Sequence, residues 1–287
     1  MNTPLETVYV PVTGATLDFD EFVAVGADDS PFATFRKLHW PGGLLAPGRI
    51  EKFYRDAETL TNAQLISRST FEIEYRVFSG TFADHSAFVT VYLQLLMIKA
   101  GCRLAASCYA THSLALIDAM KPKLIEIKVF DREATYFNRP SMAIVPLDAI
   151  KWASANIVNF LHHNADNDRL MLAFHSLGVE RFAHSPPMAL LTLWSGLEAL
   201  FAIEHEQTFR LSMMAAYYLE DTSDARKNLF EEMRSAYAMR SAVTHGRKQK
   251  PRDVANGTAW IASILRRCVV RAIETKSLPT TNSLFFP

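Results

Sequence analysis

The spacing of hydrophobic residues changes near residue 148, and this change constrains the possible fold more than any other feature. Before it, Phe71–Phe78 alternates apolar and polar residues, which is the period-two pattern of a half-buried strand. Residues 7–12, 16–19 and 124–130 have a similar β-like character. After residue 148, apolar residues recur every three or four positions, as on one face of a helix. The sequence therefore predicts an α+β protein.

The first part, residues 1–147, is expected to be a β-rich domain. Turn-forming segments such as Asp28-Asp29-Ser30-Pro31 and Ser79-Gly80 separate its apolar runs. Several short strands bounded by turns favour a sandwich or a barrel-like architecture. Residues 88–98 are rich in Val, Tyr and Leu, and both a buried strand and a helix remain open for them.

The second part, residues 148–278, is expected to be all-helical, with a short tail at residues 279–287. Ser185 followed by Pro186 is a typical start of a helix, and Pro251 marks another. Gly246 predicts a helix end with a left-handed cap. The expected helices cover residues 148–163, 168–183, 187–203, 206–220, 224–245 and 252–276.

Composition limits the classes of function. The 287 residues are 49% hydrophobic, which is enough for two modest cores. The formal net charge is zero, so any attraction to nucleic acid has to be local. The three cysteines have no CxxC spacing, so we expect neither a disulfide framework nor a metal site. The longest apolar run is about half of the ~20 residues that span a membrane, and no signal-peptide pattern precedes it. We expect a cytoplasmic protein without a membrane segment.

Polar residues interrupt two of the predicted helices. Glu198 lies in an otherwise apolar helix, where a carboxylate requires a partner. Tyr237, Arg240 and Ser241 follow helical spacing and form one stripe. His245 comes five residues after Arg240, a separation of about 140° around a continuous helix. The helix end at Gly246 relaxes that restriction, so the imidazole can turn back towards Arg240.

These residues resemble a known family. The segments are Leu-Trp-Ser-Gly-Leu-Glu-Ala-Leu-Phe at 193–201, Phe-Arg-Leu at 209–211, and Tyr-Ala-Met-Arg-Ser-Ala-Val-Thr-His-Gly at 237–246. Together they are similar to the Apea-like branch of the HEPN superfamily, whose signature is an arginine and a histidine four to six residues apart. The resemblance covers about residues 150–277.

The resemblance implies a homodimeric, metal-independent RNA endonuclease that needs no cofactor. The 2′-hydroxyl of the RNA would attack the adjacent phosphate, with His245 as general acid or base. Arg240 would orient the phosphate and stabilise its developing charge. Glu198 would hold Arg240 or His245 in place. Related chains act as toxins or antiviral defence effectors, so residues 1–147 would be a sensor of an unknown trigger or a substrate selector.

Local charge is compatible with RNA as the partner. Between residues 240 and 271 there are eight Lys or Arg residues and one acid, Asp253. Four cations directly follow His245 and are candidates for contacts with the RNA backbone: Arg247, Lys248, Lys250 and Arg252. The alternative is a solvated loop that complements the dipole of the preceding helix. Ser241 is a further candidate RNA contact, and so is Tyr237, for which core packing is favoured.

Two other functions remain open at this level. The helical domain could be a HEPN scaffold that dimerises or binds RNA without cleaving it. Alternatively, the protein could be a sensor in which the β-rich domain binds a small ligand and the helices transmit the signal.

Overall fold

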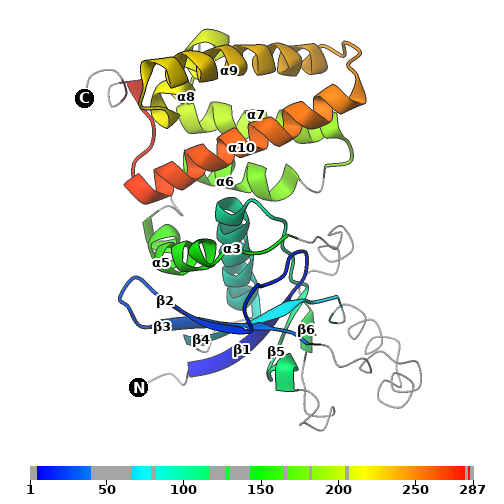
Figure 1. The fold of residues 1–287 in the computed structure, drawn as a ribbon, viewed down its shortest axis with the longest axis vertical. Coiled ribbons are helices and arrows are strands. Elements are labelled where there is room, and N and C mark those ends of the chain that lie inside the picture. The colour runs from blue at the N-terminus through cyan, green and yellow to red at the C-terminus, as the bar shows by residue number, and fades with distance from the viewer. Residues whose placement is uncertain are drawn as a thin grey trace. The chain divides into compact units, whose positions relative to one another are not determined.

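The computed structural model describes residues 5–39, 66, 68–78, 82–116, 127–129, 143–163, 167–180, 183–203, 207–281 and 284. The chain forms two compact units, Met1–Val158 and Asn159–Pro287. The division lies inside helix α5 (Leu147–His163), the first helix that the change of spacing predicts. Figure 1 shows that the strands belong to the first unit and that the second contains helices. The α+β class is thus confirmed.

A six-stranded antiparallel sheet forms the base of the first unit, in the order β2-β3-β4-β1-β5-β6. The segment Asp28–Pro31, which the sequence marks as a turn, connects β2 to β3. The Asp28 carboxylate accepts hydrogen bonds from the backbone N–H and the hydroxyl of Ser30. The strands are β1 (Leu5–Val12), β2 (Glu21–Val25), β3 (Pro31–Lys37), β4 (Phe71–Phe78), β5 (Cys108–Ala110) and β6 (Ile127–Val129).

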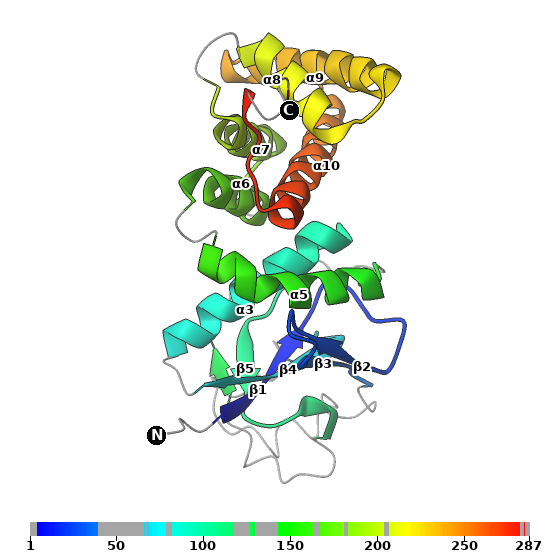
Figure 2. The same cartoon turned by 90° about the vertical axis from the view of Figure 1, so that its left-hand side faces the viewer.

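Helices α3 (Phe82–Ala100) and α5 lie over one face of this sheet (Figure 2). Tyr92 of α3 packs its ring 6.2 Å from Phe35 of β3 and donates or accepts a 2.7 Å hydrogen bond with Ser154 of α5. The sheet contributes the apolar members of its alternating strands, such as Phe71, Ile73 and Tyr75. This face is covered by helices, and among the described residues the outer strands β2 and β6 do not pair with each other, so the sheet is open. The expectation of a sandwich or barrel is therefore wrong.

The first unit contains further departures from the sequence-based expectations. Residues 88–98 belong to α3, which settles the open choice between strand and helix. The expected strand at 16–19 is reduced to one bridge between Thr16 and Ile144. Of the expected strand at 124–130, residues 127–129 form β6 and the others lie outside the described part.

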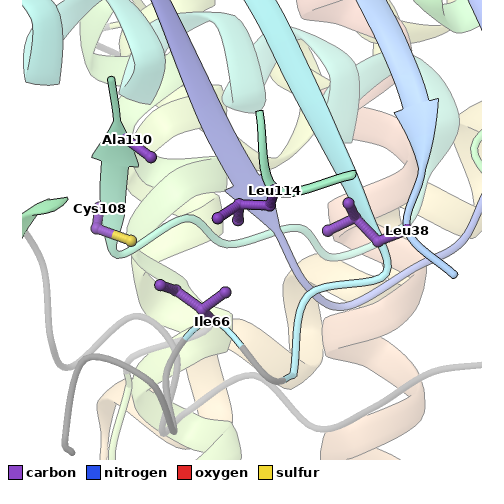
Figure 3. Packing of buried hydrophobic residues seen from close by; sticks show 5 residues of the cluster. All are labelled: Leu38, Ile66, Cys108, Ala110 and Leu114. Atoms are coloured by element: carbon purple, nitrogen blue, oxygen red, sulfur yellow. The ribbon is translucent and has the colours of Figure 1, made fainter. Parts of the chain in front are cut away.

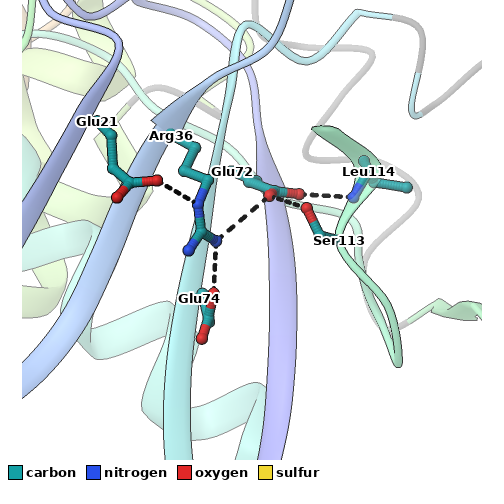
Figure 4. A network of polar contacts seen from close by, with 6 residues as sticks. All are labelled: Glu21, Arg36, Glu72, Glu74, Ser113 and Leu114. Carbon is teal, nitrogen blue, oxygen red and sulfur yellow. Dashed lines mark hydrogen bonds and ion pairs between the residues drawn. The ribbon is translucent and has the colours of Figure 1, made fainter. Parts of the chain in front are cut away.

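The opposite face of the sheet contains a second, smaller core. Leu114, in the short 3-10 helix η1 (Leu114–Leu116), packs with buried side chains from several strands and loops (Figure 3). The other members of this cluster are Leu38, Ile66, Cys108 and Ala110. Beside the cluster lies a polar network around Arg36 (Figure 4). In the network, Arg36 of β3 and Glu72 and Glu74 of β4 alternate along their strands with the helix-facing residues.

The second unit is a bundle of helices in which α7 packs against each of the others. The apolar character of α7 follows from this position, since Leu193, Trp194 and Leu197 are all fully buried. Ser185 is its N-cap residue and Pro186 its first residue, as the sequence predicts. The helices are α6 (Asp168–Val179), α7 (Pro186–Phe201), α8 (Gln207–Leu219), α9 (Ser223–Thr244) and α10 (Pro251–Thr275). Within the described ranges, no helix combines the length and apolarity needed to cross a membrane.

Candidate catalytic and phosphate-binding site

The centre of the candidate site is an ion pair between α7 and α9. The Nη2 atom of Arg240 lies 3.1 Å from Oε1 and 3.2 Å from Oε2 of Glu198. The side chains are 24% and 17% exposed, so the pair is largely shielded from water. Arg240 is therefore the cation that a carboxylate inside an apolar helix requires. The contact fixes the guanidinium against α7.

Two aromatic rings support the pair from inside the bundle. Tyr237 precedes Arg240 by about one helical turn, and its ring centre is 5.3 Å from the guanidinium carbon. Its ring also packs edge-on against the indole of Trp194, with the centres 5.2 Å apart. Only 8% of Tyr237 is exposed, which favours core packing over stacking against RNA.

The hydroxyl of Tyr237 shares the electrostatic environment of the ion pair. Burial raises the pKa of Tyr237, the charge of Arg240 opposes this shift, and the Glu198 carboxylate adds to it by its charge and a hydrogen bond. Glu198 therefore interacts with both Tyr237 and Arg240. A substitution at Tyr237 or at Glu198 is therefore expected to move the guanidinium of Arg240.

Trp194 is a member of this site that sequence reasoning missed. Its side chain is fully buried, and its Nε1 has no hydrogen-bond partner among the described residues. Trp194 and Glu198 are four residues apart on α7, so they share one helix face. The four-residue spacing could have identified Trp194 from the sequence, because it places the indole next to the binding partner of Glu198.

His245 occupies the C-cap position of α9 and is exposed. The N–H of Arg247 donates to the carbonyl of Ala242, and the N–H of Gly246 donates to that of Val243. This pair of bonds, with Gly246 at φ 67°, is a Schellman motif. The cap that the sequence predicts is thus present. Within the described part of one chain, however, no hydrogen bond or ring contact joins the imidazole to Arg240.

The four cations that follow His245 are all exposed: Arg247, Lys248, Lys250 and Arg252. None of them forms an ion pair with another described residue. Lys250 is the N-cap of α10 and Arg252 lies in its first turn, where the helix dipole disfavours positive charge. The helix dipole therefore accounts for cations at 247 and 248, but not for those at 250 and 252.

Ser241 is half-buried next to Arg240, and its carbonyl accepts the backbone N–H of His245. It thus links the arginine to the helix end through the backbone. Within the described residues, no group of three or more His, Cys, Asp or Glu side chains has an arrangement that could hold a metal ion. Neither the ion pair nor the basic loop provides the ligand set of a metal site.

Comparison of the chain with protein-family models, with curated proteins and with solved structures gives no match. The chemistry of the site is therefore inferred from its own residues and geometry.

Proposed function

We propose that the second unit is a metal-independent RNA endonuclease of HEPN type. One observation supports this most strongly: residues 240–252 gather an anchored arginine, an exposed histidine and four exposed, unpaired cations. Such a segment provides a proton-transfer group next to a cationic surface for phosphates. RNA is the substrate because its own 2′-hydroxyl can serve as the nucleophile.

Arg240 is suited to hold the phosphate under attack. It donates to Glu198 through Nη2 alone, and its Nη1 has no partner among the described residues. A phosphate oxygen can accept from that nitrogen while Glu198 keeps the guanidinium in place. Glu198 is then a positioning residue, whereas Arg240 touches the reacting group.

His245 would transfer protons to and from the reacting oxygens. Among the described residues of one chain, no hydrogen bond joins it to Arg240. We propose that a homodimer places two such pairs in one cleft. The basic loop would then hold the RNA backbone on either side. The first unit would select the substrate or respond to a trigger, and the protein would act in the cytoplasm as a toxin or defence effector.

A second candidate function is a HEPN-type scaffold that binds RNA without cleaving it. The observation that favours it is that no hydrogen bond joins His245 to Arg240 among the described residues of one chain. Under this alternative the cation-rich loop would still bind phosphates, but the imidazole would have no chemical role.

Replacing His245 with Ala separates the two functions. We expect RNA cleavage in the presence of a chelator to fall by a factor of about 10²–10⁴, the usual contribution of a general acid or base. RNA affinity should stay nearly unchanged. The matched control is His175→Ala, since His175 is another exposed histidine in the same unit. Cleavage that persists in His245→Ala, or that falls equally in the control, would contradict the nuclease.

A further inference from the structure

An exposed seam of aromatic and arginine side chains runs between α8 and α9. Phe209 of α8 packs edge-on against Phe230 of α9, with the ring centres 5.6 Å apart. Tyr217, eight residues further along α8, lies beneath the guanidinium of Arg226 at 4.4 Å. Arg234 covers the Phe230 ring at 5.6 Å. The two helices are therefore antiparallel here, and the seam extends for about 12 Å, eight residues of helix.

The rings of this seam are open to solvent. Phe209 is 53% exposed and Tyr217 is 37% exposed. Exposed aromatic rings are costly in water unless a partner covers them. Both rings lie on α8, and the partly exposed Phe230 of α9 packs against Phe209, so the three rings form a surface that spans the two helices. None of these rings belongs to the Arg240 site, which uses the inner face of α9.

The arginines give the seam its chemical character. Arg226 donates through Nε to the carbonyl of Glu220 at 2.8 Å, which holds its plane over Tyr217. Arg234 pairs with Glu231 at 3.5 Å, but both side chains are more than half exposed, and such a pair contributes little. The seam therefore presents alternating flat rings and flat cations.

We propose that the seam binds the unpaired bases of single-stranded RNA. Unpaired bases stack on aromatic rings and on guanidinium planes, and the adjoining phosphates are attracted to the same arginines. A duplex hides its base faces and cannot use such a surface. Aromatic and arginine side chains are also common in protein interfaces, so self-association through the seam is an outcome that would overturn the proposal.

This inference rests on the proposed nuclease function, because the seam would deliver the substrate to it. Phe230 and Arg240 belong to the same helix and are ten residues apart, about 15 Å along its axis. An RNA strand bound at the seam could thus extend along α9, past Arg240, to the basic loop. The enzyme would accordingly cleave single-stranded regions in preference to paired ones.

The test measures binding of the full-length protein to a short, labelled single-stranded DNA, which has no 2′-hydroxyl to cleave. Replacing Phe209 with Ala or Leu should weaken binding by about 5- to 100-fold, the usual effect of losing one stacked base. Phe209→Tyr should keep the affinity. Met188→Ala is the matched control, since Met188 is 55% exposed and lies on another helix.

Three results would overturn the proposal. Phe209→Ala or Phe209→Leu could bind single-stranded DNA with wild-type affinity, or Phe209→Ala could lose as much affinity for duplex DNA as for single-stranded DNA. A fourth would be self-association of the wild type that Phe209→Ala abolishes, since the seam would then be a protein interface. Cleavage by wild type is measured separately. If wild type does not cleave RNA but Phe209→Ala weakens binding, the binding seam is supported and the nuclease function is rejected. If wild type cleaves RNA and Phe209→Ala binds normally, only the seam is rejected.

Discussion

Among the described residues, Glu72 is the one carboxylate that is fully buried. Its hydrogen-bond partners show which parts of the fold it connects. Its side chain is 0% exposed, and it accepts hydrogen bonds from the hydroxyl of Ser113 and, at 2.7 Å, from the N–H of Leu114 (Figure 4). Arg36 lies 3.8 Å away but also contacts Glu21 at 2.7 Å and Glu74. Glu72 therefore ties η1 to the sheet while sharing one cation with two other carboxylates.

This arrangement predicts a dependence of stability on pH. Burial raises the pKa of Glu72, although its hydrogen bonds and Arg36 oppose the shift. A carboxyl group whose pKa is higher in the folded state stabilises the fold fully below its unfolded pKa of about 4.3, and this contribution is lost as the pH rises through the folded value. The amide of Glu72→Gln cannot ionise, so the variant does not lose this contribution to stability as the pH rises.

The corresponding measurement is urea unfolding of wild type and Glu72→Gln between about pH 4 and about pH 8, the range over which such a carboxyl titrates. The unfolding free energy of the variant, relative to wild type, should rise with pH. One lost hydrogen bond will shift the whole curve by a constant amount. A difference that does not change with pH would show that Glu72 does not titrate as its burial requires.

At the scale of elements, the packing of α7 depends on close helix crossings. A Cβ atom at Gly196 would lie 2.6 Å from Cβ and 2.7 Å from Oγ of Ser176 on α6, and 3.2 Å from Leu265 on α10. At Gly257 of α10, the nearest atom would be Sδ of Met239, at 2.7 Å. The first neighbour is fixed to the backbone, whereas the second is the end of a flexible side chain.

The two glycines therefore predict opposite responses to alanine. Gly196→Ala should lower the free energy of unfolding by about 1–3 kcal/mol, because α6 and α7 must separate. Gly257→Ala should be neutral or stabilising by up to about 1 kcal/mol, because Met239 can move and alanine favours the helix. Thermal and urea unfolding of both variants test this. Equal losses would show that the α6–α7 contact is not as close as described.

The helices of the second unit could be predicted from sequence, and parts of the first unit could not. Each amphipathic helix buries one face, so its period survives in the sequence, and α9 and α10 begin and end within about one residue of expectation. The exception is α6, which ends at Val179 rather than at 183. In residues 88–98 of α3, where burial is nearly continuous, all positions but Thr90 and Gln94 are apolar, so the period that separates helix from strand is lost.

Strands β2, β3 and β5 were not predicted. The burial of β2 and β3 is incomplete and their apolar residues do not alternate strictly, as in Pro31–Lys37. All three residues of β5 are buried, which leaves no alternation to detect. Their pairing depends on partners far away in the chain, such as β4 beside β3, and that information is not local.

For the molecule as a whole, the sequence predicted the need for a partner at Glu198 and the cap at Gly246, and the structure contains both. It could not predict the exposed position of His245 relative to Arg240, because five residues across a helix end leave the imidazole free in orientation. The support from Trp194 was also missed, since a buried ring gives the same pattern as ordinary core, whereas core packing was favoured for Tyr237. In the chemistry that we propose, a second copy of the chain completes the cleft that contains the two groups.

We propose that Arg240 and His245 cleave RNA through attack by its own 2′-hydroxyl. The most direct measurement is mass analysis of products from an oligonucleotide that contains one ribonucleotide among deoxyribonucleotides, incubated with the full-length protein and a chelator. We predict cleavage only at the ribonucleotide, with a 2′,3′-cyclic phosphate at the new end, and none with Arg240→Ala or His245→Ala. Cleavage of the all-deoxy strand, a requirement for added metal, or unchanged products with either variant would contradict this mechanism.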